Sequence, residues 1–170
     1  MNPKQVVQSL ESDGGFQRWR TNHPDDILAH IFLETDNIQV GFFDPSRSTM
    51  TTFIVGTELH IIPDQEILRG DSAIDPLDLS QIRFSPQQAQ EVADALRKTH
   101  YTAEQVIKTL SILQTIDGLC VYNITYFTAS FKTINIKVSA IDGSVVRHSI
   151  GSLVDLEKGN KDNKNSPHTP

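Results

Sequence analysis

The sequence has little cysteine, no long apolar run and no excess of basic residues. Its one cysteine, Cys120, excludes an internal disulfide and a zinc site built from several cysteines. No stretch approaches the run of about 18 apolar residues that a transmembrane helix needs. The first ten residues contain one lysine and no apolar core of a signal peptide. We therefore expect a cytoplasmic protein.

The balance of charge is acidic, with a formal net charge of −6 and an isoelectric point near 5.4. Proteins that bind the nucleic-acid backbone carry basic patches, so this balance argues against a nucleic-acid partner. The 170 residues suit one domain or two small subdomains with a shared core. We expect a monomer or a homodimer that binds a protein or peptide, and no membrane association.

The motifs that usually accompany catalysis or cofactor binding are also missing. The sequence contains no G-x-G-x-x-G, no Walker-type phosphate loop and no G-x-S-x-G elbow. Cys120 lies between Leu119 and Val121 in an expected strand, where a thiol usually behaves as a small apolar side chain. We therefore expect no catalytic residue and no cofactor.

Hairpin signals are the strongest positive feature of the sequence. Asp117-Gly118 and Asp142-Gly143 are each flanked by β-branched and aromatic residues, and such pairs favour type I′ turns, which need positive φ at both central positions. An antiparallel sheet is therefore predicted for the second half of the chain.

The first half is predicted to begin with a helix, because Asn2 is a good N-cap and Pro3 suits the first helical position. Gly14-Gly15 is expected to end that helix, and Phe16 and Trp19 to lie on a short second helical piece. Strands are predicted at 27–35, 38–43, 50–55 and 59–62.

Some finer expectations concern these strands and the turns between them. Alternation in the first strand predicts one face formed by Ile27, Ala29, Ile31 and Leu33. Asp36-Asn37 is expected to form a tight turn, and Pro63 to stop the fourth strand.

The second half is predicted to contain a second capped helix, which starts at Ser85-Pro86 and runs to about Lys98. Before it, 64–78 reads as a connection with one helical turn near 66–68, and Leu77, Leu79 and Ile82 as an edge strand. The stripe on the helix is formed by Ala89, Val92, Ala93 and Leu96.

The order of elements repeats with an offset of about eighty residues, as a helix followed by a meander of strands. We predict an α+β fold with two such helix-plus-antiparallel-meander units, in which helices pack on the sheet. The predicted division is an N-terminal subdomain at 1–84, a C-terminal subdomain at 85–156 and a disordered polar tail at 157–170.

The second unit resembles the PepSY domain, whose pattern is a helix, a three-stranded meander and a final hairpin. The segment 135–146 reads N-I-K-V-S-A-I-D-G-S-V-V and carries the resemblance, which extends over 85–150 and by analogy over 1–62. The resemblance implies a PepSY- or cystatin-like fold. It also implies a non-catalytic binding or regulatory module, because PepSY-like domains bind or inhibit peptidases. The chain lacks the attached peptidase and the membrane helix of many family members.

An alternative function is a small metal-binding protein or hydrolase. His23, Asp25, Asp26 and His30 lie within eight residues, and imidazole with carboxylate can ligate a divalent ion. However, His30 lies mid-strand, roughly 13 Å beyond Asp26 along a straight strand. A shared site would need other elements that fold back toward them, so we expect no metal, with these residues as the alternative.

Overall fold

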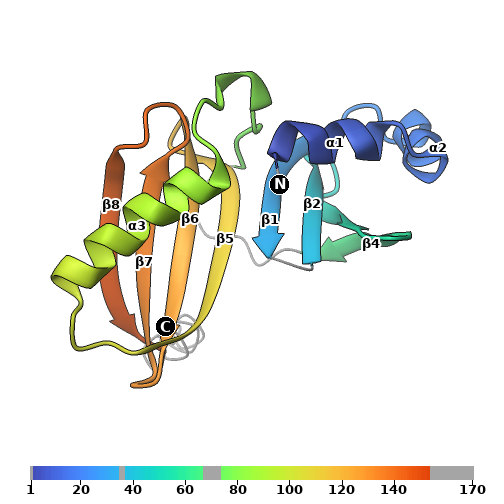
Figure 1. The fold of residues 1–170 in the computed structure, drawn as a ribbon. Helices are drawn as coiled ribbons and strands as arrows, with labels where there is room; N and C mark the ends of the chain where they lie inside the picture. The colour runs from blue at the N-terminus through green and yellow to red at the C-terminus, as the bar shows by residue number, and fades with distance from the viewer. Residues whose placement is uncertain (1, 35–36, 67–73, 154–170) are drawn as a thin grey trace, which may run out of the picture.

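The computed structural model describes residues 2–34, 37–66 and 74–153. In chain order, its elements are α1 (Pro3–Glu11), α2 (Gly14–Asn22), β1 (Ile27–Glu34), β2 (Asn37–Asp44), β3 (Thr49–Val55), β4 (Leu59–Glu66), the 3₁₀-helix η1 (Leu79–Gln81), α3 (Pro86–His100), β5 (Val106–Ile116), β6 (Leu119–Thr128), β7 (Lys132–Ser139) and β8 (Val145–Ser152) (Figure 1). Within the described ranges, no helix is long and apolar enough to cross a membrane.

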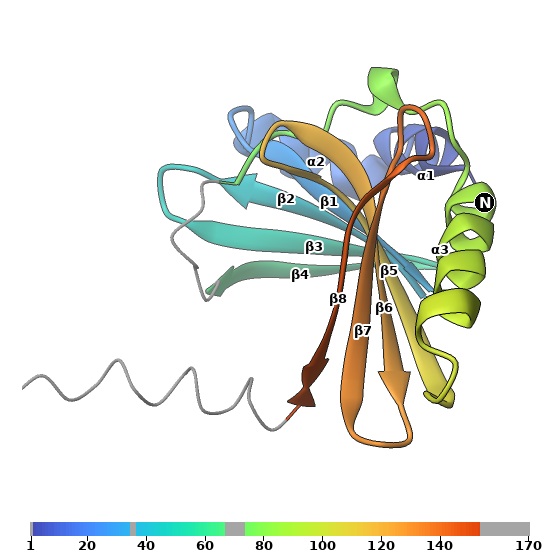
Figure 2. The ribbon, with the colours of Figure 1, turned by 90° about the vertical axis from the view of Figure 1, so that its left-hand side faces the viewer.

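The strands form one eight-stranded sheet in the order β4-β3-β2-β1-β5-β6-β7-β8, and each neighbouring pair is antiparallel. The α+β fold with an antiparallel sheet is therefore confirmed. β1 and β5 join the two sets of strands at the centre, where His30 pairs with Gln114. Figure 2 shows that β2–β4 run across the directions of β6 and β7, so the sheet is strongly twisted between its ends.

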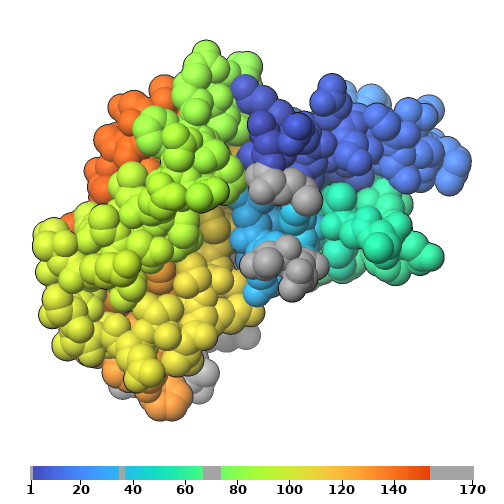
Figure 3. All heavy atoms as spheres, viewed as in Figure 1, coloured from blue at the N-terminus to red at the C-terminus, as the bar shows by residue number. Residues whose placement is uncertain are grey.

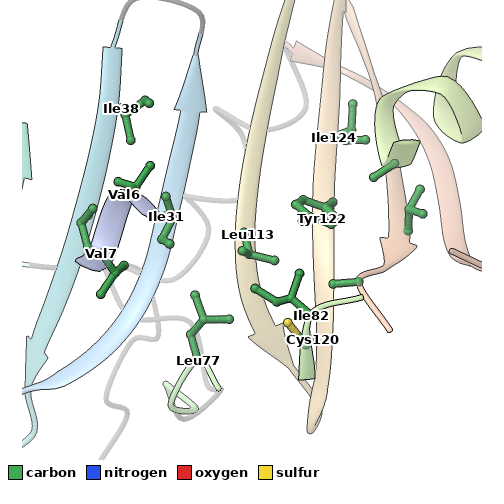
Figure 4. Packing of buried hydrophobic residues seen from close by; sticks show 14 of the residues in the cluster. Val6, Val7, Ile31, Ile38, Leu77, Ile82, Leu113, Cys120, Tyr122 and Ile124 are labelled. Atoms are coloured by element: carbon green, nitrogen blue, oxygen red, sulfur yellow. The ribbon is translucent and has the colours of Figure 1, made fainter. Parts of the chain in front are cut away.

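The three α-helices cover one face of the sheet. Side chains of α1, α2 and α3 share one buried cluster with the strands of both sets, including Leu10, Phe16 and Ala89 with Ile31 and Tyr122. Figure 4 shows part of this cluster between the strands and the segment around Leu77 and Ile82. In the space-filling view, α1 and α3 lie on the same side of the molecule (Figure 3). The core therefore extends across the junction of the two strand sets.

The opposite face of the sheet carries no helix among the described residues. Its N-terminal part holds a small second cluster of Ala29, Phe43 and Met50, against which Ile27 and Ile74 pack. That cluster lies over β1–β3. The face of β6–β8 has no comparable apolar cover within the described ranges, and we call it the open face.

Both cap-plus-proline helix starts are confirmed. Asn2 Oδ1 accepts from the Lys4 N–H at 2.9 Å, and Ser85 and Gln88 form a reciprocal capping box. The prediction for Gly14-Gly15 is wrong, because these glycines begin α2 instead of ending α1. Asp13 is the reason: its carboxylate accepts from the Gly15 and Phe16 N–H groups and so caps a new helix.

Two strand predictions are also corrected. A bulge between Leu28 and His30 interrupts the alternation of β1, so Ala29 joins the small cluster while Ile31 joins the main core. Pro63 does not stop β4, which continues to Glu66. β4 is an edge strand, where a proline without an N–H is tolerated.

The two Asp-Gly pairs form different turns. Asp117 and Gly118 both have positive φ, at 51° and 74°, as the type I′ prediction requires. At the second turn only Gly143 has positive φ, and the Ser139 N–H donates to the Ser144 carbonyl across a longer loop. The second turn is therefore not a two-residue type I′ turn.

The remaining expectations fall on the connections. Leu77 and Ile82 are buried in the core and flank η1, so the predicted edge strand there is wrong. The N-terminal segment 2–34 and the first strands otherwise follow the predicted order. The turn at Asp36, the helical turn at 66–68 beyond Glu66 and the tail at 157–170 lie outside the described residues.

Candidate functional site: the β8 edge and the open face

The two edges of the sheet are built differently. β4 contains Pro63, which has no N–H, and Asp64, which has a left-handed φ of 49°. The register between β3 and β4 shifts at this point, between Met50 and Thr52. Proline and bulges are devices that prevent strand pairing at an edge, so β4 is protected against an added strand.

β8 has a bulge at Val146, where its register with β7 shifts between Lys137 and Val138, but its pairing is regular from Arg147 to Ser152 and this stretch has no proline. The eight residues of β8, V-V-R-H-S-I-G-S, include no proline and one formal charge, that of Arg147. Val146 and Ile150 are large apolar residues that stay exposed, at 43% and 41% of their surface. In the described part of the chain, no strand pairs with the outer side of β8.

The hydrogen-bond register shows which backbone groups point outward. The Leu153 N–H donates to the Phe131 carbonyl at 3.0 Å, and the same register continues through the pairs of β7 and β8 toward Lys137 and Arg147. Hydrogen-bonded and non-hydrogen-bonded pairs alternate in an antiparallel ladder. The backbone groups of His148 and Ile150 therefore point away from β7, toward the free edge.

Next to this edge, the open face displays rows of side chains that run across β6, β7 and β8. The rows alternate with Tyr122, Ile124 and Tyr126, which face the helices and the core. In order along the strands, the rows consist of Asn123, Lys137 and Arg147; of Thr125, Asn135 and Ser149; and of Phe127, Thr133 and Gly151. We call the first the cationic row and the last the apolar row.

The rows line a shallow hollow of about 510 Å³, which Leu153 also borders. In the middle row, Asn135 Nδ2 donates to Thr125 Oγ1 at 2.9 Å. Among the described residues, no carboxylate lies within ion-pair distance of Lys137 or Arg147. The hollow thus has a cationic end and an apolar end, about 13 Å apart along a strand.

The residues of the alternative metal site are separated in space. His23 stacks on Trp19 with ring centroids 4.8 Å apart, and its Nδ1 lies 2.9 Å from the Trp19 carbonyl oxygen. His23, Asp25 and Asp26 border one hollow, whereas His30 borders another. Within the described ranges, no group of three or more His, Cys, Asp or Glu side chains is arranged to hold a metal ion.

Asp26 belongs to a small acidic and basic cluster at the β2–β3 turn. Burial, followed by the nearby charge of Asp44, raises the pKa of Asp26. Asp44 accepts hydrogen bonds from Arg47 and then from Ser46, and these hydrogen bonds lower the pKa of Asp44. Arg47 also contacts Asp64 at 2.9 Å, so the cluster fastens the turn to β4. These contacts give the Asp44 and Asp64 carboxylates a structural role.

His30 lines a hollow of about 440 Å³ at the junction of β1 and β5, with Met50, Asp75 and Gln114 on its walls. Burial lowers the pKa of His30, which favours a neutral ring. The ring lies flat against β2, because a Cβ on Gly41 would come within 2.3 Å of its Cε1 atom. Asp75 and Asp117 also border this hollow, but among the described residues these side chains and His30 do not form a group arranged to hold a metal ion.

Cys120 is buried in β6, and burial raises the pKa of its thiol to about 11. A thiol with so high a pKa is a poor nucleophile, which agrees with the sequence-based interpretation of an apolar strand residue.

Sequence reasoning did not identify the cationic row. Lys137 and Arg147 are ten residues apart in the chain and separated by the turn at Asp142. The signal that could have found them is the register: pairing outward from a two-residue turn would mispair β7 and β8, whereas the longer loop and bulge bring these two side chains together.

A search of solved structures finds the crystal structure of a "putative lipoprotein" from Clostridium difficile 630, with a TM-score of 0.52 and 19% sequence identity. The match covers 84% of this chain and 97% of that chain. At this identity the likeness concerns the fold alone. No protein-family model matches the sequence, and no curated protein matches it either.

Proposed function

We propose that this protein is a non-catalytic binding module that recognises an extended segment of a protein or peptide by adding it as a strand to β8. The observation that carries the proposal is the contrast between the edges: β4 is blocked by Pro63 and Asp64, whereas β8 is not. Strand addition uses backbone hydrogen bonds for affinity and neighbouring side chains for selectivity.

The outward backbone groups support this proposal. His148 and Ile150 would exchange hydrogen bonds with an incoming strand, and the exposed apolar surface of Val146 and Ile150 would be buried. His30 with Asp75, His23 with Asp26, and His100 with His148 lie at three separate places in the described part of the chain. No group of three or more His, Cys, Asp or Glu side chains there is arranged to hold a metal ion. Dispersal of this kind favours binding over catalysis.

We also propose that the fold contains two copies of a PepSY-like unit. Support comes from the element order, because α1 and α2 precede one four-stranded meander and α3 precedes another. β1 and β5 lie antiparallel at the centre, so a two-fold operation normal to the sheet would exchange the two meanders. Superposition of the two halves in an experimental structure tests this: unrelated helix positions would contradict a duplication.

The binding proposal is tested by selecting peptides from a random display library on the immobilised full chain, followed by hydrogen exchange of the chain with and without a selected peptide. We expect slower exchange of the His148 and Ile150 amides, since these would donate to the added strand. The amides of β4 serve as an internal control and should not change. Protection at β4 or around His30, with none on β8, would contradict the proposal.

A further inference from the structure

Two like charges are held side by side on the open face. Lys137 and Arg147 occupy directly opposed positions of β7 and β8. Like charges at such positions destabilise a sheet. Other cations of the chain do have acidic partners, for example Lys132 with Glu104 at 2.6 Å and Lys108 with Glu34 at 3.1 Å. Within the described ranges, the Lys137 and Arg147 side chains have none.

Asn123 completes the same row on β6. Its Oδ1 atom is buried and has no hydrogen-bond partner among the described residues. A half-turn of this amide exchanges its oxygen and nitrogen, and it would present N–H donors at the same place. The cationic row thus offers a guanidinium, an ammonium and an amide to one region of the hollow, and these groups suit a carboxylate.

The row ends at the edge where the added strand would lie. If His148 and Ile150 exchange hydrogen bonds with that strand, Arg147 sits in a non-hydrogen-bonded pair with it. Such pairs bring Cα atoms to about 4.5 Å and side chains into their closest contact. An acidic side chain opposite Arg147 would therefore reach the guanidinium and offset one of the two positive charges of the Lys137 and Arg147 pair.

The other end of the hollow differs in chemistry. Gly151 has no side chain, and nothing lies within 4 Å of the Cβ position that it leaves open. Phe127 of the same row and Leu153 border the space. A residue of the added strand opposite Gly151 would thus meet apolar surface, four positions away from the residue opposite Arg147.

We propose that the ligand of the β8 edge is an acidic extended peptide, with an aspartate or glutamate opposite Arg147 and an apolar residue four positions away on the same face. This inference rests on the proposed strand addition and specifies its partner. An acidic peptide complements the charge of the cationic row. A second copy of the chain fits less well, because its β8 would bring another arginine to the same edge.

The test compares peptides enriched from a random display library by the wild-type chain and by charge-reversed variants. Wild type should enrich Asp or Glu, with an apolar residue four positions away. The double variant Lys137→Glu and Arg147→Glu should enrich Lys or Arg at that position. A wild-type-selected peptide should bind Arg147→Glu at least tenfold more weakly, and a peptide with Lys in place of the acid should recover binding.

Two controls keep this result interpretable. The single variant Arg147→Glu places opposite charges at the Lys137 pair, so it should unfold at the same or a higher temperature than wild type. Lys108→Glu reverses a cation on β5 that already pairs with Glu34, and it should leave the selection unchanged. Equal loss of binding in both variants would indicate a general charge effect and overturn the inference.

The outcomes separate the inference from the proposed function. Peptides that protect β8 without any acidic preference would overturn the inference and leave strand addition intact. Peptides that bind without protecting β8 would contradict both. Slow exchange of the β8 amides in the free chain would also overturn the inference that the ligand is a separate peptide. If that protection does not depend on protein concentration, the edge is occupied by the chain's own residues after 153. If it rises with protein concentration, the edge is occupied by a second copy of the chain.

Discussion

At the scale of single residues, His30 and Gly41 depend on each other. The His30 ring occupies the space above β2 where a Cβ of residue 41 would lie, 2.3 Å from the ring. The two residues are directly paired in the register of β1 and β2. Glycine at this position therefore allows a strand histidine to lie flat on its neighbour instead of extending into the hollow.

This pairing predicts a non-additive pair of substitutions. Gly41→Ala should lower the free energy of unfolding by about 1–3 kcal/mol, because the ring must leave its position. In a His30→Ala background, the same Gly41→Ala change should be neutral or slightly stabilising, since alanine is otherwise better than glycine in a strand by about 0.5–1 kcal/mol. Urea unfolding of the four proteins measures the cycle, and additive changes would show that the ring does not occupy this position.

Residue identity alone could not predict the cationic row, whereas the rise of a strand already indicated that His30 lies away from the turn that contains His23. The alternation of β7 and β8 indicates which side chains share a face, but which of them are opposed depends on the length of the loop at Asp142. The metal alternative depended on elements that would bring His23 and His30 together. The structure places them in different hollows, because the His23 ring stacks on Trp19 at the end of α2.

At the scale of elements, the two hairpin turns have the same Asp-Gly sequence and different surroundings. Gly118 and Gly143 both have φ of 74°. A Cβ on Gly118 would meet nothing within 4 Å, whereas a Cβ on Gly143 would lie 2.2 Å from the Phe84 ring. The second turn is therefore constrained by the chain segment before α3 as well as by its own backbone.

These surroundings predict unequal effects of one substitution. Gly118→Ala should destabilise the fold by about 1 kcal/mol, from backbone strain alone. Gly143→Ala carries the same strain and in addition displaces Phe84, an overpacking effect of about 1–3 kcal/mol. Thermal or urea unfolding of both variants gives the comparison. Equal losses would mean that Phe84 does not pack against this turn.

Local chemistry predicted most elements, because caps, prolines and alternating apolar residues act over a few positions. Asn2 and Ser85 cap helices as expected, and a strand lies at each of the four ranges predicted for the first half of the chain. The exceptions were decided by a neighbouring cap residue and by position in the sheet. Asp13 turned a glycine pair into a helix start, and Pro63 is tolerated in β4 because no further strand lies beside it in the described chain.

At the scale of the whole molecule, the sheet continues through both strand sets and ends at two unequal edges. One core beneath the helices joins the two strand sets, so β8 is the edge of a sheet that packs on a common core. The sequence predicted an α+β fold with an antiparallel sheet. Only the structure shows the order of the strands and which two of them form the edges. The proposed function depends on this last feature, the availability of β8.

The most direct test of that feature compares Ile150→Pro with Ile150→Ala, using a peptide selected on the wild-type chain. Both variants lose the exposed isoleucine side chain, but only proline removes the outward N–H and recreates on β8 the protection that Pro63 gives β4. Circular dichroism checks that both variants fold. The account predicts that Ile150→Ala retains binding within a few-fold and that Ile150→Pro abolishes it. Equal binding by the two folded variants would contradict strand addition at β8.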